Sequence, residues 1–188
     1  MAGELWEGRF EGSPSEALQA LNDSFAFDRR MFRQDIAGSR AHVKMLTEVG
    51  LLTDGEGEQL FGALDVVETE MASGTFEPIA SDEDIHTAVE RRVTEIAGPV
   101  GGKIHTGRSR NDQVALDVRM WTRAEITEGI VPKLLSFQET LLTHARAAGD
   151  AYLPGYTHLQ QAQPVALSHH LLAHFWALSR DIDRLIAT

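Results

Sequence analysis

Apolar residues recur at every third or fourth position along most of this chain, which is the spacing of helices with one buried face. The first clear helix is predicted over residues 28–49, with Gly50 as its C-terminal cap. A second begins at the capping-box pair Thr53 and Glu56 and stops at Gly74. The buried positions expected on these two helices are Phe32, Ile36, Val43, Leu46, Leu60, Leu64, Val67 and Met71.

The pattern continues in the second half of the chain. A third helix is predicted to open at Ser81 with Asp84 and to end at Gly98-Pro99. A long helical stretch then runs from about Asn111 to Ala148, and Pro132 must kink or divide it because proline removes a backbone donor. The inward residues expected on these segments are Ile85, Ala88, Val89, Val93, Ile96, Val114, Val118 and Trp121.

The last helix is expected to begin with Pro164 at its first position, after an irregular segment over residues 149–163. Its apolar stripe consists of Leu167, Leu171, Phe175, Leu178, Ile182 and Leu185.

No segment shows the alternation of a strand, so the predicted fold class is all-α. Residues 1–108 are expected to form a smaller N-terminal helical domain with an extended arm before about Phe27. Residues 109–188 are expected to start a helical-bundle domain. Two long amphipathic helices cannot cover their own apolar faces, and further chain or other subunits are expected to do so.

Composition narrows the class of protein. The 188 residues carry a formal net charge of −11, which argues against general nucleic-acid binding. No run approaches the roughly 18 apolar residues of a membrane span, and the N-terminus lacks the features of a secretory signal. The chain has no cysteine and therefore no disulfide framework or thiolate chemistry. A cytoplasmic location is expected, with no membrane partner.

The segment Gly101–Gln113 (GGKIHTGRSRNDQ) is the strongest chemical signal. It places Lys103, Arg108 and Arg110 on a glycine-bearing loop in an otherwise acidic chain, directly before a helical pattern that starts at Asn111. Arginine grips carboxylates or phosphates bidentately, and a helix N-terminus offers unpaired N–H groups to anions. We predict a site for a small, multiply anionic molecule, with a solvated basic turn as the alternative. The segment lacks the Walker phosphate-loop pattern.

Two further polar clusters stand beside helix ends. The first, SDEDIHT at residues 81–87, favours a well-capped helix start, but capping does not explain His86. The second surrounds His158, whose unperturbed pKa suits proton transfer near neutrality. His170 and His174 have the spacing of metal ligands on a helix, yet no HExxH glutamate or third ligand accompanies them, so no metal is expected.

Four segments together resemble the argininosuccinate lyase branch of the fumarase/aspartase superfamily, which also includes the delta-crystallins. Trp6–Phe10 (WEGRF) is similar to the N-terminal motif of that family, and Ser81–Glu90 (SDEDIHTAVE) to its first conserved region. Lys103–Gln113 (KIHTGRSRNDQ) resembles the segment most diagnostic of this branch, and Thr157–Pro164 (THLQQAQP) its second conserved region. The resemblance covers essentially the whole chain, in the same order.

The resemblance implies reversible β-elimination of argininosuccinate to arginine and fumarate, without a metal or organic cofactor. It assigns proton abstraction to His158, with Thr157 beside it, and an orienting role to His86. The substrate has three carboxylates and a guanidinium. The residues implied to hold it are Ser24, Arg110, Asn111 and Thr157, with Lys103, Arg108 and Gln163 as weaker candidates.

The family also has a third conserved region, a Gly-Ser-Ser loop with Met-Pro-x-Lys-x-Asn, which these 188 residues do not contain. Its members form homotetramers whose active sites draw residues from three subunits. We therefore predict that this chain alone is inactive and that it functions within a homotetramer. The alternatives are a non-catalytic, crystallin-like or truncated homologue, or a sister lyase of the superfamily that also releases fumarate.

Overall fold

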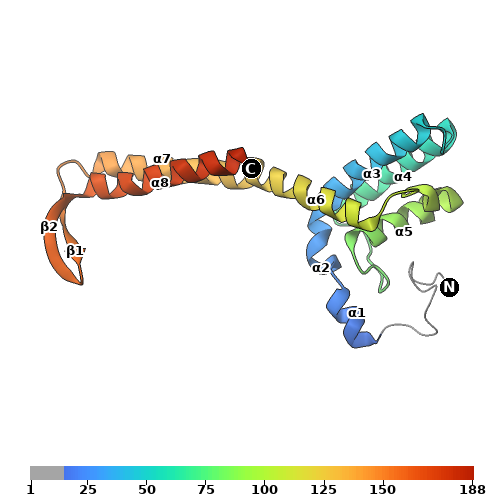
Figure 1. Ribbon diagram of the computed structural model, residues 1–188, viewed down its shortest axis with the longest axis horizontal. Helices are drawn as coiled ribbons and strands as arrows, with labels where there is room; N and C mark the ends of the chain where they lie inside the picture. The colour runs from blue at the N-terminus through green and yellow to red at the C-terminus, as the bar shows by residue number, and fades with distance from the viewer. Residues whose placement is uncertain (1–14) are drawn as a thin grey trace. The chain divides into compact units, whose positions relative to one another are not determined.

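The computed structural model describes residues 15–188, shown in Figure 1. The sequence motif Trp6–Phe10 and most of the predicted N-terminal arm lie outside the described residues. The chain divides into two compact units, Met1–Trp121 and Thr122–Thr188. The domain boundary predicted after residue 108 stays a prediction.

All regular elements in the described part of the first unit are helical, as the apolar periodicity predicted. Short helices and one 3-10 turn precede a core of longer helices, of which α6 continues into the second unit. The elements are α1 (Glu16–Asn22), α2 (Phe25–Asp28), η2 (Arg29–Met31), α3 (Phe32–Glu48), α4 (Asp54–Ser73), α5 (Ile85–Ala97), the 3-10 turn η3 (Gly98–Lys103) and α6 (Arg110–Ala124).

The core of this unit forms where α3, α4 and α5 pack on one another, side by side in Figure 1. Most of the expected inward residues are buried there, with Phe32 and Met71 partly buried at its edge. The expectation for Ile96 is wrong, because that side chain is 38% exposed while Ala97 is buried. Ala97 follows Val93 by four residues and therefore continues the buried row of α5. The fully enclosed core includes Ile36, Val43, Leu46, Leu60, Leu64, Val67, Ile85, Val89, Val93 and Ile104.

The helix ends follow the local sequence closely. Thr53 and Glu56 form the predicted capping box, and α4 ends at Gly74 with a left-handed φ of 75°. The predicted start of α5 at Ser81 is wrong. Asp84 is the N-cap instead, and its carboxylate accepts the Thr87 N–H at 2.6 Å. A cap must directly precede the first helical residue, and in α5 that residue is Ile85.

In the second unit Pro132 divides the predicted long helix, as expected. The helix passes through a π-helical turn, η4 (Glu125–Ile130), before it resumes as α7 (Val131–Ala147). Proline removes one backbone donor, and the wider turn before it accommodates the interruption. The chain then returns along α7 as α8 (Leu167–Ala187), and the two helices pack side by side (Figure 1).

A β-hairpin between α7 and α8 is the element that sequence reasoning missed. Strands β1 (Tyr152–Thr157) and β2 (Gln160–Ala166) pair antiparallel, with Pro154 opposite Pro164. Pro164 therefore lies in a strand and does not begin a helix, because α8 starts only at Leu167. Proline is compatible with a two-stranded sheet, because each strand has one edge without a partner strand. In the sequence, however, the two prolines are typical of a loop. None of the helices in residues 15–188 is long and apolar enough to cross a membrane.

The capping box gives a direct test of helix α4. Thr53→Ala removes the side-chain oxygen that accepts the Glu56 N–H at 3.2 Å. We expect the free energy of unfolding to fall by about 1 kcal/mol in urea titrations. Thr69→Ala, at an exposed position inside the same helix, is the control and should leave stability unchanged or slightly higher. Equal losses in the two variants would show that the cap contributes nothing specific.

Candidate active site

Ser24 is joined to the start of α5, although 59 positions separate it from Glu83. Its N–H donates to the Glu83 carbonyl at 2.8 Å, and its hydroxyl donates to Asp28 Oδ2 at 2.6 Å. Asp28 in turn accepts the Ile85 N–H at 3.0 Å, so its carboxylate satisfies a free donor of the α5 N-terminus. Burial raises the pKa of Asp28 despite these hydrogen bonds. Ser24 therefore has a defined position beside the Ser81–Glu90 segment.

His86, one turn into α5, is the centre of a buried polar network. Its Nδ1 lies 2.8 Å from Asp35 Oδ1 of α3 and 3.4 Å from Asp117 Oδ2 of α6. The Gln113 amide also donates to Asp35 Oδ1, at 2.5 Å. His86 and these three partners are at most 1% exposed. The network ties α3, α5 and the first half of α6 together inside the first unit.

Opposite charges set the protonation of this network. Burial opposes charge on both partners, but their mutual hydrogen bond and attraction lower the pKa of Asp35 and raise the pKa of His86. His86 and Asp35 are therefore an imidazolium–carboxylate pair. Burial and repulsion from Asp35 raise the pKa of Asp117 to about 7. By spacing alone, Asp35, His86 and Asp117 could also hold a cation, since their ligand atoms lie within 4.8 Å of one another.

A second layer of contacts holds Arg110 at the start of α6. Its guanidinium donates to Gln113 Oε1 at 3.4 Å and lies 3.6 Å from Glu90 Oε2. His105 bridges the two partners, because Nδ1 contacts Glu90 at 3.1 Å and Nε2 contacts the Gln113 amide at 3.3 Å. The His105 hydrogen bond holds the pKa of Glu90 below its ordinary value. Arg110 is thus fixed from two sides by residues that also contact the buried network.

The remaining residues of the basic loop differ in their surroundings. Asn111 is exposed in the first turn of α6, where its N–H donates to Ser109 Oγ at 3.2 Å. Arg108 is half-buried, and its guanidinium approaches Gly38 of α3 closely. Lys103 forms an ion pair with Glu56 of α4. The structure therefore brings Ser24, His86, Arg110 and Asn111 into one connected region, while Lys103 points to a different partner.

The second unit holds Thr157, His158 and Gln163 on its hairpin. Thr157 pairs with Gln160, and His158 with Leu159 forms the two-residue turn between the strands. Both turn residues have left-handed backbones, with φ of 50° and 62°. This matches the turn type that suits the strand twist, but non-glycine residues adopt that conformation at a cost. All three candidate side chains are exposed, so the turn presents the His158 imidazole to solvent.

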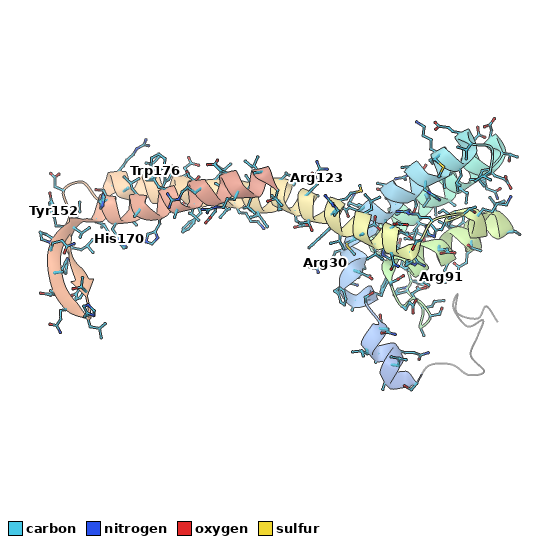
Figure 2. The ribbon with its side chains drawn as sticks, viewed as in Figure 1. Arg30, Arg91, Arg123, Tyr152, His170 and Trp176 are labelled. Atoms are coloured by element: carbon cyan, nitrogen blue, oxygen red, sulfur yellow. The ribbon has the colours of Figure 1, made fainter. Side chains whose placement is uncertain are left out.

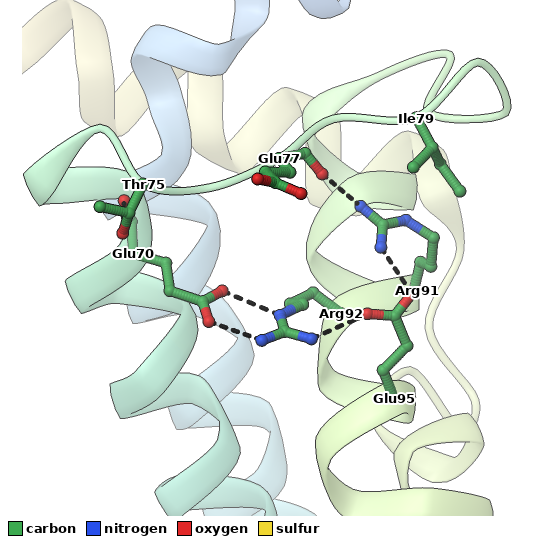
Figure 3. Close-up of a pocket in the computed structure, with 7 residues that line it drawn as sticks. All are labelled: Glu70, Thr75, Glu77, Ile79, Arg91, Arg92 and Glu95. Carbon is green, nitrogen blue, oxygen red and sulfur yellow. Dashed lines mark hydrogen bonds and ion pairs between the residues drawn. The ribbon is translucent and has the colours of Figure 1, made fainter.

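Two other polar features of the described residues have structural explanations. A surface cavity of about 300 Å³ is lined by two arginines, but Arg92 is bound by both Glu70 oxygens, at 2.9 and 2.6 Å (Figure 3). Arg91 is likewise paired with Asp82 and Glu95, so neither guanidinium is free for an anion. His170 projects from α8 in Figure 2, and its ring meets that of His174 edge-on at 5.1 Å.

Comparison with known proteins identifies the family of this chain. A family model described simply as lyase matches residues 8–188. The chain belongs to this lyase family.

Two similar curated proteins are both named argininosuccinate lyase. The argininosuccinate lyase of Roseiflexus sp. (strain RS-1) is 53% identical over 181 residues, which are 96% of this chain and 40% of the relative. The argininosuccinate lyase of Thermobifida fusca is 53% identical over 182 residues, 96% of this chain and 38% of the relative. The chain thus spans about 40% of the length of these curated relatives.

Solved lyase structures share the fold. An EDDS lyase variant with bound fumarate superposes with a TM-score of 0.68 at 28% sequence identity, covering 94% of this chain and 35% of that one. The all-α class, with a small hairpin inserted, and the resemblance stated from the sequence motifs are both confirmed.

Sequence reasoning missed two residues of the buried network in this lyase, Asp35 and Asp117. The sequence nevertheless contained a signal for both residues, because each interrupts the apolar pattern of a predicted helix. Asp35 lies between the predicted inward positions Phe32 and Ile36, and Asp117 lies between the predicted inward positions Val114 and Val118. The prediction for Val118 is wrong, because its side chain is 44% exposed and Asp117 takes the buried position of that turn. An ionisable residue on the apolar stripe of a helix must find a buried partner, because an unpaired buried charge is costly. That rule would have marked both carboxylates as buried groups in need of a partner, without saying which residue the partner is.

The hairpin turn gives the second test. Leu159 is 94% exposed and left-handed, so Leu159→Gly removes backbone strain without losing buried area. We expect the free energy of unfolding of the second unit to rise by about 0.5–1 kcal/mol. Tryptophan fluorescence during urea titration gives the measurement, in a chain where Trp6→Phe and Trp121→Phe leave Trp176 as the only tryptophan. Gln160→Gly, at the neighbouring strand position, should instead lower stability. A loss in both variants would contradict a strained turn.

Proposed function

We propose that this chain supplies the N-terminal part of the active site of an argininosuccinate lyase. The observation that carries the proposal is the 53% identity, across 96% of the chain, to relatives of that name. The reaction is the reversible β-elimination of argininosuccinate to arginine and fumarate. The family membership supports a lyase, and the choice of argininosuccinate rests on the relatives.

The β-elimination requires one base and several hydrogen-bond donors that bind the substrate carboxylates. His158 removes a proton from the carbon next to a carboxylate of the succinyl part, and negative charge builds on that carboxylate. The carbon–nitrogen bond then breaks, its electron pair leaves with the arginine nitrogen, and the new double bond makes fumarate. A proton delivered to that nitrogen completes the release of arginine. The exposed imidazole at the hairpin turn is suited to the first step because no folded segment of its own unit covers it.

The donors proposed to hold the substrate carboxylates are Ser24, Arg110, Asn111 and Thr157. Donors already in place where charge develops lower the barrier by several kcal/mol. The fixed position of Arg110 between Gln113 and Glu90 supports this role. Arg108 and Gln163 are weaker candidates, and Lys103 is weakest because its charge is engaged by Glu56. No metal or organic cofactor is proposed for the reaction.

The complete site is proposed to form only in a homotetramer, with residues contributed by several copies. Exposed apolar side chains on α7 and α8, such as Leu135, Phe137 and Trp176, support association because their unit does not bury them. The 188-residue chain alone is predicted to form no fumarate.

A sister lyase is the second candidate. The fold neighbour that carries bound fumarate is named as an EDDS lyase, so that relative acts on a different compound within the same fold. A crystallin-like, non-catalytic role is the third possibility, although the candidate side chains His158, Thr157 and Asn111 are all present in this chain.

A chimera tests the proposal. Residues 8–188 replace the matching segment of the Roseiflexus argininosuccinate lyase, and fumarate is followed by its ultraviolet absorbance. We expect fumarate from argininosuccinate, and none from EDDS or adenylosuccinate. In this chimera, His158→Asn should lower kcat by about a hundred- to ten-thousand-fold with little change in KM.

His170→Asn is the matched control, because that imidazole is also exposed but lies on α8. It should keep full activity. A folded tetrameric chimera that turned over only another substrate would establish the sister-lyase alternative. A chimera in which both histidine variants remained active would remove His158 from the mechanism.

A further inference from the structure

Two carboxylates and one imidazole meet where α3, α5 and α6 pack. Asp35 and Asp117 are both 0% exposed, and a single ring nitrogen, His86 Nδ1, lies within 3.4 Å of each of them. Within residues 15–188, Asp35 Oδ2 and both carboxylate oxygens of Asp117 are buried without a hydrogen-bond partner. An ionised carboxylate in that position lacks the donors that would stabilise it.

The cations that face Asp117 give its carboxylate no hydrogen bond in the described part of the chain. Asp35 faces it from α3 and His86 from α5, and these two already form a pair. Arg108, before α6, is the remaining facing cation, and its Nη1 is buried without a hydrogen-bond partner in the described part of the chain. Further out, Asp84, His105 and Arg110 act on the same pair.

We propose that Asp117 is a buried carboxylic acid that shares one proton with Asp35. The shared proton leaves Asp35 and His86 as a single balanced ion pair, and that pair positions Gln113 and the first turn of α6. Because Arg110 and Asn111 stand on this turn, the pair is a positioning device for the proposed carboxylate site, and that consequence rests on the proposed function.

A proton fits this site better than a metal ion does. His86 Nδ1, which faces both carboxylates, donates its proton to Asp35 Oδ1 at 2.8 Å, so that nitrogen has no lone pair for a metal ion. Gln113 donates to the same carboxylate oxygen at 2.5 Å. A proton between Asp117 and Asp35 instead satisfies an orphaned oxygen on each side. The raised pKa of Asp117, caused by burial and then by Asp35, points the same way.

The sign of the pH dependence follows from this assignment. Asp117 binds a proton more tightly in the folded state, with a pKa of about 7 against the ordinary 3.8. Its contribution to stability is therefore complete below the ordinary pKa and is lost as pH rises through the folded value. A side chain at position 117 that cannot ionise should therefore abolish this decrease in stability with rising pH.

The test compares two isosteric variants, Asp117→Asn and Asp35→Asn. Both are made in the full chain with Trp6→Phe and Trp176→Phe, which leaves Trp121 as the only tryptophan. Urea unfolding is measured from pH 5 to 8. We expect Asp117→Asn to fold. The ratio of its folding equilibrium constant to that of the parent should rise by about tenfold per pH unit between pH 5 and 7, because only the parent loses stability over this range. Asp35→Asn, which leaves His86 without its carboxylate, should be less stable throughout or fail to fold.

Equal destabilisation by the two variants, or failure of Asp117→Asn to fold, would overturn the shared proton. So would a rise in the parent's urea midpoint on adding Zn²⁺ or Mg²⁺ that both variants lose, since that result identifies a metal site. These measurements need no substrate, so they stand whether or not the chain belongs to an argininosuccinate lyase.

The positioning role has its own readout in the chimeric enzyme. As pH rises above 7, loss of the shared proton should raise KM for argininosuccinate, and Asp117→Asn should flatten that rise relative to the parent. Parallel KM profiles for the two enzymes, in a chimera that is active, would show that the pair does not position the substrate site.

Discussion

The hydrogen-bonded ion pair between His86 and Asp35 is the contact on which the first unit depends. It joins two helices whose residues lie 51 positions apart, and both side chains are at most 1% exposed. Breaking a buried pair from one side leaves an uncompensated charge, which costs about 3–5 kcal/mol. The same pair reaches α6 through Gln113. One polar contact therefore fixes the mutual arrangement of three helices that the apolar core alone would leave less specific.

Two candidate substrate-binding residues of the first unit are linked by hydrogen bonds to the helices that this ion pair holds together. Ser24 reaches them through Asp28, which accepts a donor at the start of α5. Arg110 reaches them through Gln113 at the start of α6. In the second unit the equivalent device is the strained two-residue turn, where Leu159 takes a left-handed backbone beside the candidate base His158. Buried ion pairs and backbone strain both hold polar groups in positions that solvation alone would not favour.

The helices, and both ends of α4, were the most predictable part of the chain, because the information is local. The capping box of Thr53 and Glu56 and the stop at Gly74 follow from neighbouring residues. The hairpin was not predictable, because Pro154 and Pro164 pair only across the two strands and each looks like a loop residue alone. The partners of His86 were missed for a similar reason. Its nearest carboxylate lies 51 positions away, and only packing brings the two together.

The protonation state of His86 tests the central contact most directly. Nitrogen-15 NMR of the imidazole, titrated from pH 5 to 8, reports whether Nδ1 keeps its proton. The raised pKa of His86 predicts an imidazolium whose Nδ1 proton exchanges slowly near neutrality. A His86 ring that lost its proton in step with an ordinary histidine, near about pH 6.5, would contradict the ion pair and the frame built on it.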